Sequence, residues 1–482
     1  MGARMAGARL VGGTAVARAA AIGVALALSF GALGAVPASA AGTGPLDGVW
    51  RMDGYGTLVT VAGGSLRTYD TTRVSCLPGA VTARQVGSPG AHGATRYGEG
   101  PVASMTFTPE GRRHAVLALD DAAGVRRLER LPALPERCRQ SVDAGPLAVF
   151  DRFWATFAEN YPFFAAKGID WQAVRARYRP LVTPDTPDAQ LQQILIDMIR
   201  PLDDAHTALV HQGRTVYFGL RPGTRVPTTD LRARAAANVA RQLVAPARTF
   251  GQGKLVVGEL PGRLGYLRVD SFDGYAAGDS FQEQTAELDR ALDALLPHDA
   301  TAGADPLRGL VIDVRLNGGG SDALGLRIAS RLTDRAYTAY RKVARNDPDD
   351  PTRFTRPQPI TVRPSTAPRW TGPVALLTSG SSVSAAETFT QALMGRAPRV
   401  TRIGENTQGV FSDVLFRPLG NDPEGKDWAV FLPNEKYLDA RGRTFDGPGI
   451  PPRLRAPVFT EEDLAHGRDS ALTLARQVLT TS

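Results

Sequence analysis

The chain has 482 residues, of which 43% are hydrophobic and 22% are charged. This composition supports sizeable buried cores and excludes disorder throughout the chain. Glycine and proline number 51 and 35, which is below the share typical of low-complexity or collagen-like proteins. The net charge of +8 falls to +5 when Arg4, Arg9 and Arg18 of the first forty residues are left out. Because the other arginines are scattered along the chain, the charge gives no indication of nucleic-acid binding.

The first forty residues have the pattern of an export signal. A basic start is followed by an apolar stretch over about 19–36 and by the small residues Ala38-Ser39-Ala40. This pattern predicts a secretory signal peptide, residues 1–40, that is cleaved before Ala41. An uncleaved membrane anchor is the alternative, but the stretch is rich in Ala and Gly and barely reaches the length of a bilayer span. We therefore expect a secreted or cell-envelope protein with no stable membrane span after cleavage.

Cys76 and Cys138 are the two cysteines of the chain. In an exported protein such a pair predicts a disulfide. No histidine or further cysteine lies beside either of them, which disfavours a metal site. We expect neither a metal nor an organic cofactor.

The first half of the chain changes its apolar period once. Short alternating segments broken by glycine, such as 56–61 and 104–108, predict a small β domain over residues 41–144. From Pro146 the period becomes that of amphipathic helices. One helix is predicted at 171–178, and another begins at 186–188 with Thr186 as its cap and Pro187 in its first turn. We therefore expect a helical subdomain over residues 145–215.

The second half of the chain alternates between buried-strand and helical patterns. The strand patterns lie at 264–269, 309–314 and 373–377, and the helical patterns at 285–296 and 323–332. After a connecting segment, 216–260, this alternation predicts an α/β core over residues 261–458 and a C-terminal helix or tail over 459–482. The proline-rich segment 347–373 is expected to be a surface excursion.

Three glycines follow the strand predicted at 309–314. Gly318, Gly319 and Gly320 allow backbone N–H groups to face a developing negative charge, as an oxyanion hole requires. A phosphate-binding loop is a rival interpretation, but no Lys-Ser/Thr pair follows the glycines. A simple tight turn is the plainest alternative.

The strand predicted at 373–377 leads through a turn of small residues into a helix near Ser384. A serine there would lie exposed at a strand end, with the Ala385 N–H and the helix dipole available to an oxyanion. Ser384 could equally be a helix cap. Glu387 has the spacing of a capping box, which favours a structural role for this acid.

A further polar segment, 203–207, closes the helical subdomain and contains His206, although a lone histidine is more often structural than catalytic. Together these segments resemble the serine peptidases of the tail-specific, or carboxy-terminal processing, and tricorn-core family. The motifs lie in the family order over about 145–455. They are Asp313-Val314-Arg315-Leu316-Asn317-Gly318-Gly319, Ser382-Val383-Ser384-Ala385-Ala386-Glu387 and Ile403-Gly404-Glu405-Asn406-Thr407-Gln408-Gly409. The resemblance implies a crotonase-like α/β catalytic core and peptide or protein substrates.

The resemblance also implies roles for individual residues. Ser384 would be the nucleophile, and the backbone of Gly318 or Gly319 together with Ala385 would form the oxyanion hole. Val410 stands where the processing branch has a lysine base, so the tricorn-like branch fits better.

In that branch His206 would be the base. Asp446, three residues before Gly449-Ile450-Pro451-Pro452, would orient it, although a glutamate is expected at that place. No PDZ module is evident between His206 and Leu264. The leading hypothesis is a secreted serine peptidase. The alternative is a non-hydrolytic binding protein for a lipophilic or peptide ligand on the same scaffold.

Overall fold

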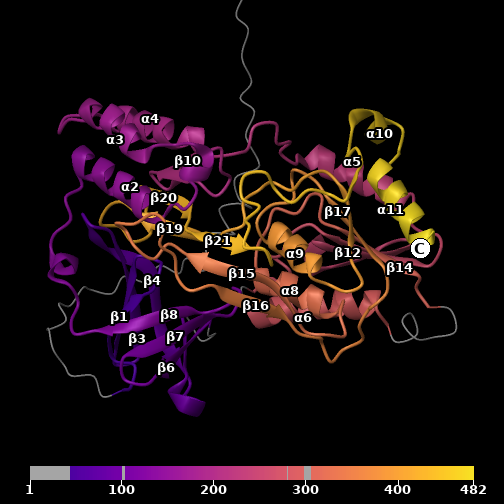
Figure 1. The fold of residues 1–482 in the computed structure, drawn as a ribbon, viewed down its shortest axis with the longest axis horizontal. Helices are drawn as coiled ribbons and strands as arrows, with labels where there is room; N and C mark the ends of the chain where they lie inside the picture. The colour runs from indigo at the N-terminus through magenta and orange to yellow at the C-terminus, as the bar shows by residue number, and fades with distance from the viewer. Residues whose placement is uncertain (1–43, 100–103, 279, 298–305, 482) are drawn as a thin grey trace, which may run out of the picture.

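The structure is a computed structural model that describes residues 44–99, 104–278, 280–297 and 306–481. The predicted signal peptide, 1–40, lies outside the described residues. A β-barrel, a helical subdomain and an α/β core follow one another along the chain (Figure 1). This mixed architecture confirms the predicted α/β fold class with a helical subdomain and a small N-terminal β domain.

The N-terminal domain is a closed barrel of eight antiparallel strands, in which β1 pairs with both β2 and β8. At this strand number the interior is just wide enough for side chains, and Trp50, Tyr97 and Phe107 are among those that fill it. The strands are β1 (Gly48–Met52), β2 (Thr57–Ala62), β3 (Ser65–Thr71), β4 (Cys76–Val86), β5 (Thr95–Gly98), β6 (Met105–Glu110), β7 (His114–Leu119) and β8 (Arg126–Leu131).

A disulfide joins Cys76, at the start of β4, to Cys138 in a short 3-10 helix (Glu136–Arg139). The pairing confirms the disulfide predicted from the sequence. It ties the segment between the barrel and the helical subdomain back to the barrel.

The helical subdomain consists of α2 (Pro146–Asn160), α3 (Trp171–Tyr178) and α4 (Asp188–Ile199). The expected cap of α4 is wrong in one detail. Pro187 itself occupies the N-cap position, and Thr186 Oγ1 instead accepts a hydrogen bond from the Thr183 N–H at 2.7 Å. The apolar faces of α2 and α4 pack together with residues of the sheet beneath them.

That sheet has four strands in the order β10-β9-β20-β19. Strands β9 (Ala208–His211) and β10 (Arg214–Phe218) follow the helices directly, whereas β19 (Val414–Pro418) and β20 (Trp428–Pro433) come from near the end of the chain. The sheet therefore joins the helical subdomain to the C-terminal part of the core.

The α/β core is built on a seven-stranded sheet in the order β11-β12-β13-β14-β17-β18-β22. Its strands from β13 to β22 are parallel, and β11 and β12 add an antiparallel edge. The strands are β11 (Arg248–Phe250), β12 (Leu255–Leu260), β13 (Leu264–Val269), β14 (Gly309–Asp313), β17 (Val374–Thr378), β18 (Thr401–Gly404) and β22 (Leu454–Arg455). The sheet thus begins inside the segment expected to be a connection.

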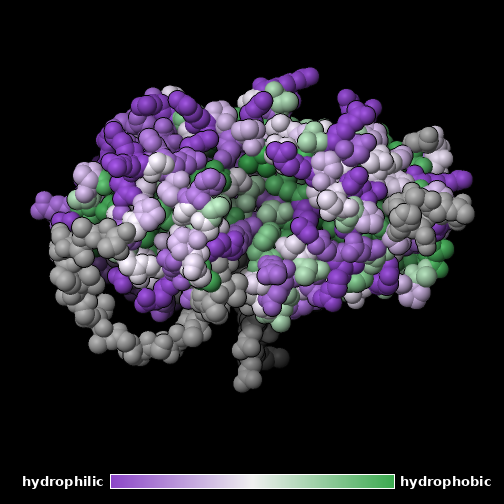
Figure 2. All heavy atoms as spheres, turned by 90° about the horizontal axis from the view of Figure 1, so that it is seen from below, coloured by the Kyte–Doolittle hydropathy of each residue, from purple (hydrophilic) through white to green (hydrophobic). Residues whose placement is uncertain are grey.

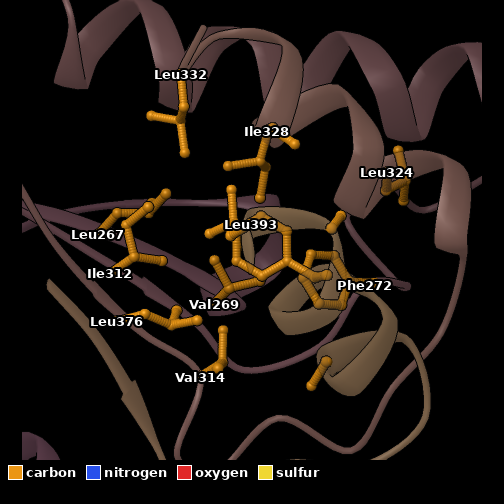
Figure 3. Packing of buried hydrophobic residues seen from close by; sticks show 14 of the residues in the cluster. Leu267, Val269, Phe272, Ile312, Val314, Leu324, Ile328, Leu332, Leu376 and Leu393 are labelled. Atoms are coloured by element: carbon orange, nitrogen blue, oxygen red, sulfur yellow. The ribbon is translucent and has the colours of Figure 1, made fainter. Parts of the chain in front are cut away.

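Helices cover both faces of this sheet because its central strands are apolar on both sides. On one face Leu267, Ile312 and Leu376 pack against α8 and α9, as Figure 3 shows. The helices on this face are α6 (Phe281–Leu295), α8 (Asp322–Ser330) and α9 (Ala385–Met394), and those on the other face are α5 (Thr229–Ala240), α10 (Glu461–Ala465) and α11 (Ser470–Thr480).

A third, three-stranded sheet has the order β16-β15-β21 and lies between the barrel and the core (Figure 1). Its strands are β15 (Tyr337–Ala344), β16 (Gln358–Val362) and β21 (Glu435–Leu438). The expectation that 347–373 is only a surface excursion is therefore wrong. Ile360, Val362 and Trp370 from this segment are buried in the main core. The short β16 is concealed in the sequence by the prolines on either side of it.

The surface is largely hydrophilic, with apolar side chains recessed near the middle of the face shown in Figure 2. None of the helices in the described ranges combines the length and the apolar character that a bilayer span requires.

Candidate active site

Ser384 stands at a sharp junction between β17 and α9. Its backbone has φ 56° and ψ −116°, a conformation that costs a non-glycine residue about 1–3 kcal/mol and persists only when its surroundings enforce it. The preceding turn is held by hydrogen bonds from Ser382 Oγ to the Val314 carbonyl at 2.8 Å and from the Val383 N–H to the Asn317 carbonyl at 3.0 Å. Ser384 itself remains partly exposed while the helix behind it is buried.

Glu387 fixes the first turn of α9 from inside the protein. Its fully buried carboxylate accepts hydrogen bonds from the N–H groups of Gly409 at 2.6 Å, Val410 at 2.8 Å and Ser384 at 3.3 Å. Burial raises the pKa of Glu387 to about 8, against these lowering contacts. Glu387 therefore links Ser384, three residues before it, to the backbone of residues 409–410. This agrees with the structural role that its spacing favours.

Two backbone N–H groups beside Ser384 are available to a negatively charged oxygen. Within the described part of the chain, no hydrogen bond engages the N–H of Gly318 or of Ala385. The Gly319 N–H, by contrast, donates to Asn317 Oδ1 at 2.8 Å. Of Gly318 and Gly319, the two glycines that the resemblance assigns to the oxyanion hole, Gly318 thus has the free donor, and Gly319 has another function.

Gly319 makes room for the serine. A Cβ atom at this position would lie 2.8 Å from Ser384 Cβ and 3.3 Å from Ser384 Oγ, and its φ of +103° also favours glycine. The strand that leads to these glycines is anchored by Arg315, which is fully buried and paired with Asp313 at 2.6 Å and Asp469 at 2.7 Å. The loop between β14 and α8 is therefore held close against the serine.

His206 lies in the turn that precedes β9. Its backbone N–H donates to Asp204 Oδ1 at 2.9 Å, and the other oxygen of Asp204 accepts from the Tyr161 hydroxyl at 2.8 Å. Burial lowers the pKa of His206, while the charges of Asp204 and Asp413 oppose that shift. The ring is therefore kept in the neutral form, which can accept a proton. Its Nδ1 atom is buried without a hydrogen-bond partner among the described residues.

Asp446 lies next to the backbone segment that contacts Ser384. Its Oδ1 accepts from the Phe411 N–H at 3.2 Å, and its Oδ2 accepts from the Thr444 hydroxyl. The Ser384 N–H donates to the Val410 carbonyl at 3.2 Å, so adjacent residues of one segment contact the serine and the aspartate. Burial raises the pKa of Asp446 to about 7, and the nearby charge of Asp204 adds to the rise.

The segment that holds His206 is linked to the same region through Arg221. The Gly219 N–H donates to the Thr207 carbonyl at 2.9 Å, and Arg221 Nη1 donates to the carbonyls of Thr407 at 2.9 Å and Pro448 at 3.1 Å. The three predicted side chains therefore belong to segments that contact one another. The structure contains no hydrogen bond between His206 and Asp446 in the part of the chain that it describes.

Sequence reasoning missed two residues of this region. Asn317 was included in a motif, but its contact with the Gly319 N–H depends on a turn that the motif alone does not define. Asp413 carries no local signal, because the partners of its carboxylate come from distant strands. No cluster of three or more metal-ligating side chains occurs in the described ranges.

Two family models match parts of the chain. Residues 263–455 match Peptidase family S41, and residues 145–200 match the Tricorn protease C1 domain. The chain thus contains an S41 peptidase domain over residues 263–455. It is accordingly a serine peptidase, and the family match covers the segments that carry Gly318, Ser384 and Asp446.

Several solved structures resemble parts of the chain. A candidate peptidase from Parabacteroides merdae is 27% identical, with a TM-score of 0.57 over 70% of this chain and 97% of the other. Mature CPAF complexed with lactacystin is 13% identical, with a TM-score of 0.46 over 69% and 97% of the two chains. The tricorn protease is also 13% identical, with a TM-score of 0.42 over 88% and 46%. No curated protein matches the chain.

Proposed function

We propose that this chain is a secreted serine peptidase that cleaves peptide bonds through Ser384, His206 and Asp446. The observation that carries the proposal is the backbone of Ser384. A strained serine at a strand–helix junction, partly exposed beside the free N–H groups of Gly318 and Ala385, supports the assignment of Ser384 as the nucleophile.

The proposed reaction follows the logic of acyl transfer. Ser384 Oγ attacks the scissile carbonyl while neutral His206 takes its proton, and the oxyanion that forms faces the N–H groups of Gly318 and Ala385. His206 then returns the proton to the leaving amine, and water releases the acyl group by the same steps in reverse order. The carboxylate of Asp446 stabilises the imidazolium. This step requires the His206 ring to turn its unpartnered Nδ1 atom toward the acid when substrate binds.

Two observations support export. The sequence pattern of 1–40 is that of a signal peptide, and a disulfide such as Cys76–Cys138 persists in oxidising compartments outside the cytosol. We therefore propose that the peptidase acts outside the cytoplasm on peptides or proteins.

A fluorophosphonate probe tests the proposal, because it labels only an activated serine. The purified mature protein should be labelled, whereas Ser384→Ala and His206→Ala should abolish labelling and Asp446→Asn should reduce it. Ser330→Ala is the matched control, because this serine lies at the end of α8 and its hydroxyl donates to the Arg327 carbonyl at 2.7 Å rather than to the turn that holds Ser384. A folded wild type that stays unlabelled would refute the proposal and favour ligand binding on the same scaffold.

A further inference from the structure

A buried charge cluster joins the N-terminal barrel to the catalytic core. It consists of Arg126 from β8, Lys342 from β15, Glu435 from β21 and Asp413, which directly precedes β19. Arg126 and Lys342 contact the same oxygen of Asp413, at 2.6 and 2.9 Å, and Lys342 Nζ lies 3.1 Å from Glu435. The Arg126, Lys342 and Glu435 side chains are only 7%, 4% and 0% exposed, whereas that of Asp413 is 30% exposed.

The cluster is balanced, with two cations facing two carboxylates. Buried pairs of this kind contribute little net stability, because desolvation offsets most of the attraction, but losing one partner leaves a buried charge uncompensated. Such a group is best explained by the geometry it enforces. Here it fixes how the barrel and the core meet, with further support from the Tyr55 hydroxyl, which contacts Glu435.

One path leads from this cluster to the nucleophile along the chain. Asp413 is the last residue of a short backbone segment, 409–413. Its N–H donates to Glu435 Oε2 at 3.3 Å. Within the same segment the Val410 carbonyl accepts from the Ser384 N–H, and the Phe411 N–H donates to Asp446. The cluster therefore holds one end of the segment that contacts both proposed catalytic side chains.

A second path runs through side chains. The Tyr437 hydroxyl lies 3.2 Å from Asp413 Oδ1 and 2.9 Å from Asp322 Oδ2, and the other oxygen of Asp322 accepts from Thr388 Oγ1 at 2.6 Å. Thr388 is one turn beyond Ser384 in α9. Both paths thus begin at Asp413 and end at the first turn of the helix that carries the nucleophile.

We infer that Arg126, although it belongs to the barrel, is a positioning residue for the active site. Through Asp413 it holds the 409–413 segment and the first turn of α9 in the arrangement that aligns Ser384. The inference rests on the proposed function for the role of Ser384. The inference gives the N-terminal barrel, which lies outside the residues that match family S41, a part in catalysis.

The test compares Arg126→Met with a matched barrel variant, Arg130→Met. Arg130 donates to the carbonyls of Pro45, Asp47 and Arg112 and stacks 4.1 Å over Trp50, so these partners all lie in the N-terminal domain. Both variants should lower the melting temperature. Only Arg126→Met should lower the maximal rate constant of fluorophosphonate labelling, by about ten-fold or more, with the half-saturating probe concentration unchanged. The double variant Arg126→Met/Asp413→Asn removes one charge of each sign and should be labelled as slowly as Arg126→Met. It replaces the single variant in this comparison if Arg126→Met fails to fold.

Hydrogen–deuterium exchange provides a readout that does not need activity. The amides of Gly409, Val410 and Asp413, which donate to buried carboxylates, should exchange faster in the Arg126 variants than in wild type and in Arg130→Met. Wild-type labelling with wild-type exchange in either Arg126 variant would overturn the inference. A wild type that is never labelled would instead refute the proposed function, and the exchange data alone would then decide whether Arg126 orders the segment.

Discussion

Replacing Gly319 by alanine should disable the nucleophile without dismantling the protein. The added methyl carbon would lie 2.8 Å from Ser384 Cβ, roughly 0.7 Å closer than the ~3.5 Å of the shortest favourable carbon–carbon contact. The backbone cannot easily retreat, because the Gly319 N–H is bonded to Asn317 and its carbonyl accepts the Phe272 N–H at 2.7 Å. The serine must therefore move.

The expected loss follows from that displacement. A shift approaching 1 Å at a reacting group reduces the rate on the order of 10²-fold, and alanine at a φ of +103° adds backbone strain of about 1–3 kcal/mol. Gly442→Ala separates the two effects, since Gly442 has a φ of +78° and nothing within 4 Å of a new Cβ. Both variants should be destabilised in urea melts by the backbone strain, Gly319→Ala the more because of its clash, whereas only Gly319→Ala should lose fluorophosphonate labelling. Labelling of Gly319→Ala at the wild-type rate would show that the close contact with Ser384 has no catalytic consequence.

Three further results are expected. Labelling of the wild type should increase with pH through a midpoint near 7, because burial raises the pKa of Asp446 to about 7 and its ionised form is the active one. Asp446→Asn should move that midpoint to lower pH, because His206, whose pKa is lowered by burial, then governs the rate, and an unmoved midpoint would contradict the role of Asp446. Replacing Cys76 and Cys138 by alanine should lower the free energy of unfolding by about 4 kcal/mol, from the 62-residue separation of the disulfide, as measured in urea without reductant. Arg315→Met should cost about 3–5 kcal/mol in the same assay, because two buried carboxylates lose their partner; a smaller change than for an exposed arginine would be incompatible with this pairing.

The elements that the sequence predicts well are those whose own pattern determines them. The aromatic stripe of α2 and the apolar runs of β14 and β17 are found at the expected places because each buries a face that is readable from local spacing. β16 is not predicted by local spacing, since its five residues lie among prolines and form a strand only by pairing with β15. Tertiary pairing, rather than propensity, decides that segment.

The candidate site likewise has features that the local sequence predicts and features that depend on tertiary contacts. The junction at Ser384 and the glycines after β14 were indicated by small residues at strand ends, where backbone N–H groups can turn outward. Which glycine offers a free N–H could not be predicted, because Asn317 occupies the Gly319 donor through a side-chain contact. The surroundings of His206 were equally hidden, since Asp413 acts on it from a segment some 200 residues away.

Strand β9, which begins two residues after His206, pairs with β20 so that Ala208 lies opposite Phe431. About 220 residues of chain separate these partners, and closing so long a loop is slow because its entropy must be lost before the pairing is gained. The turn that holds His206 can therefore reach its final position only after β20, at residues 428–433, has been made. A chain truncated before β20 would contain Ser384 but would leave β9 without this partner strand, so the proposed base would lack its support.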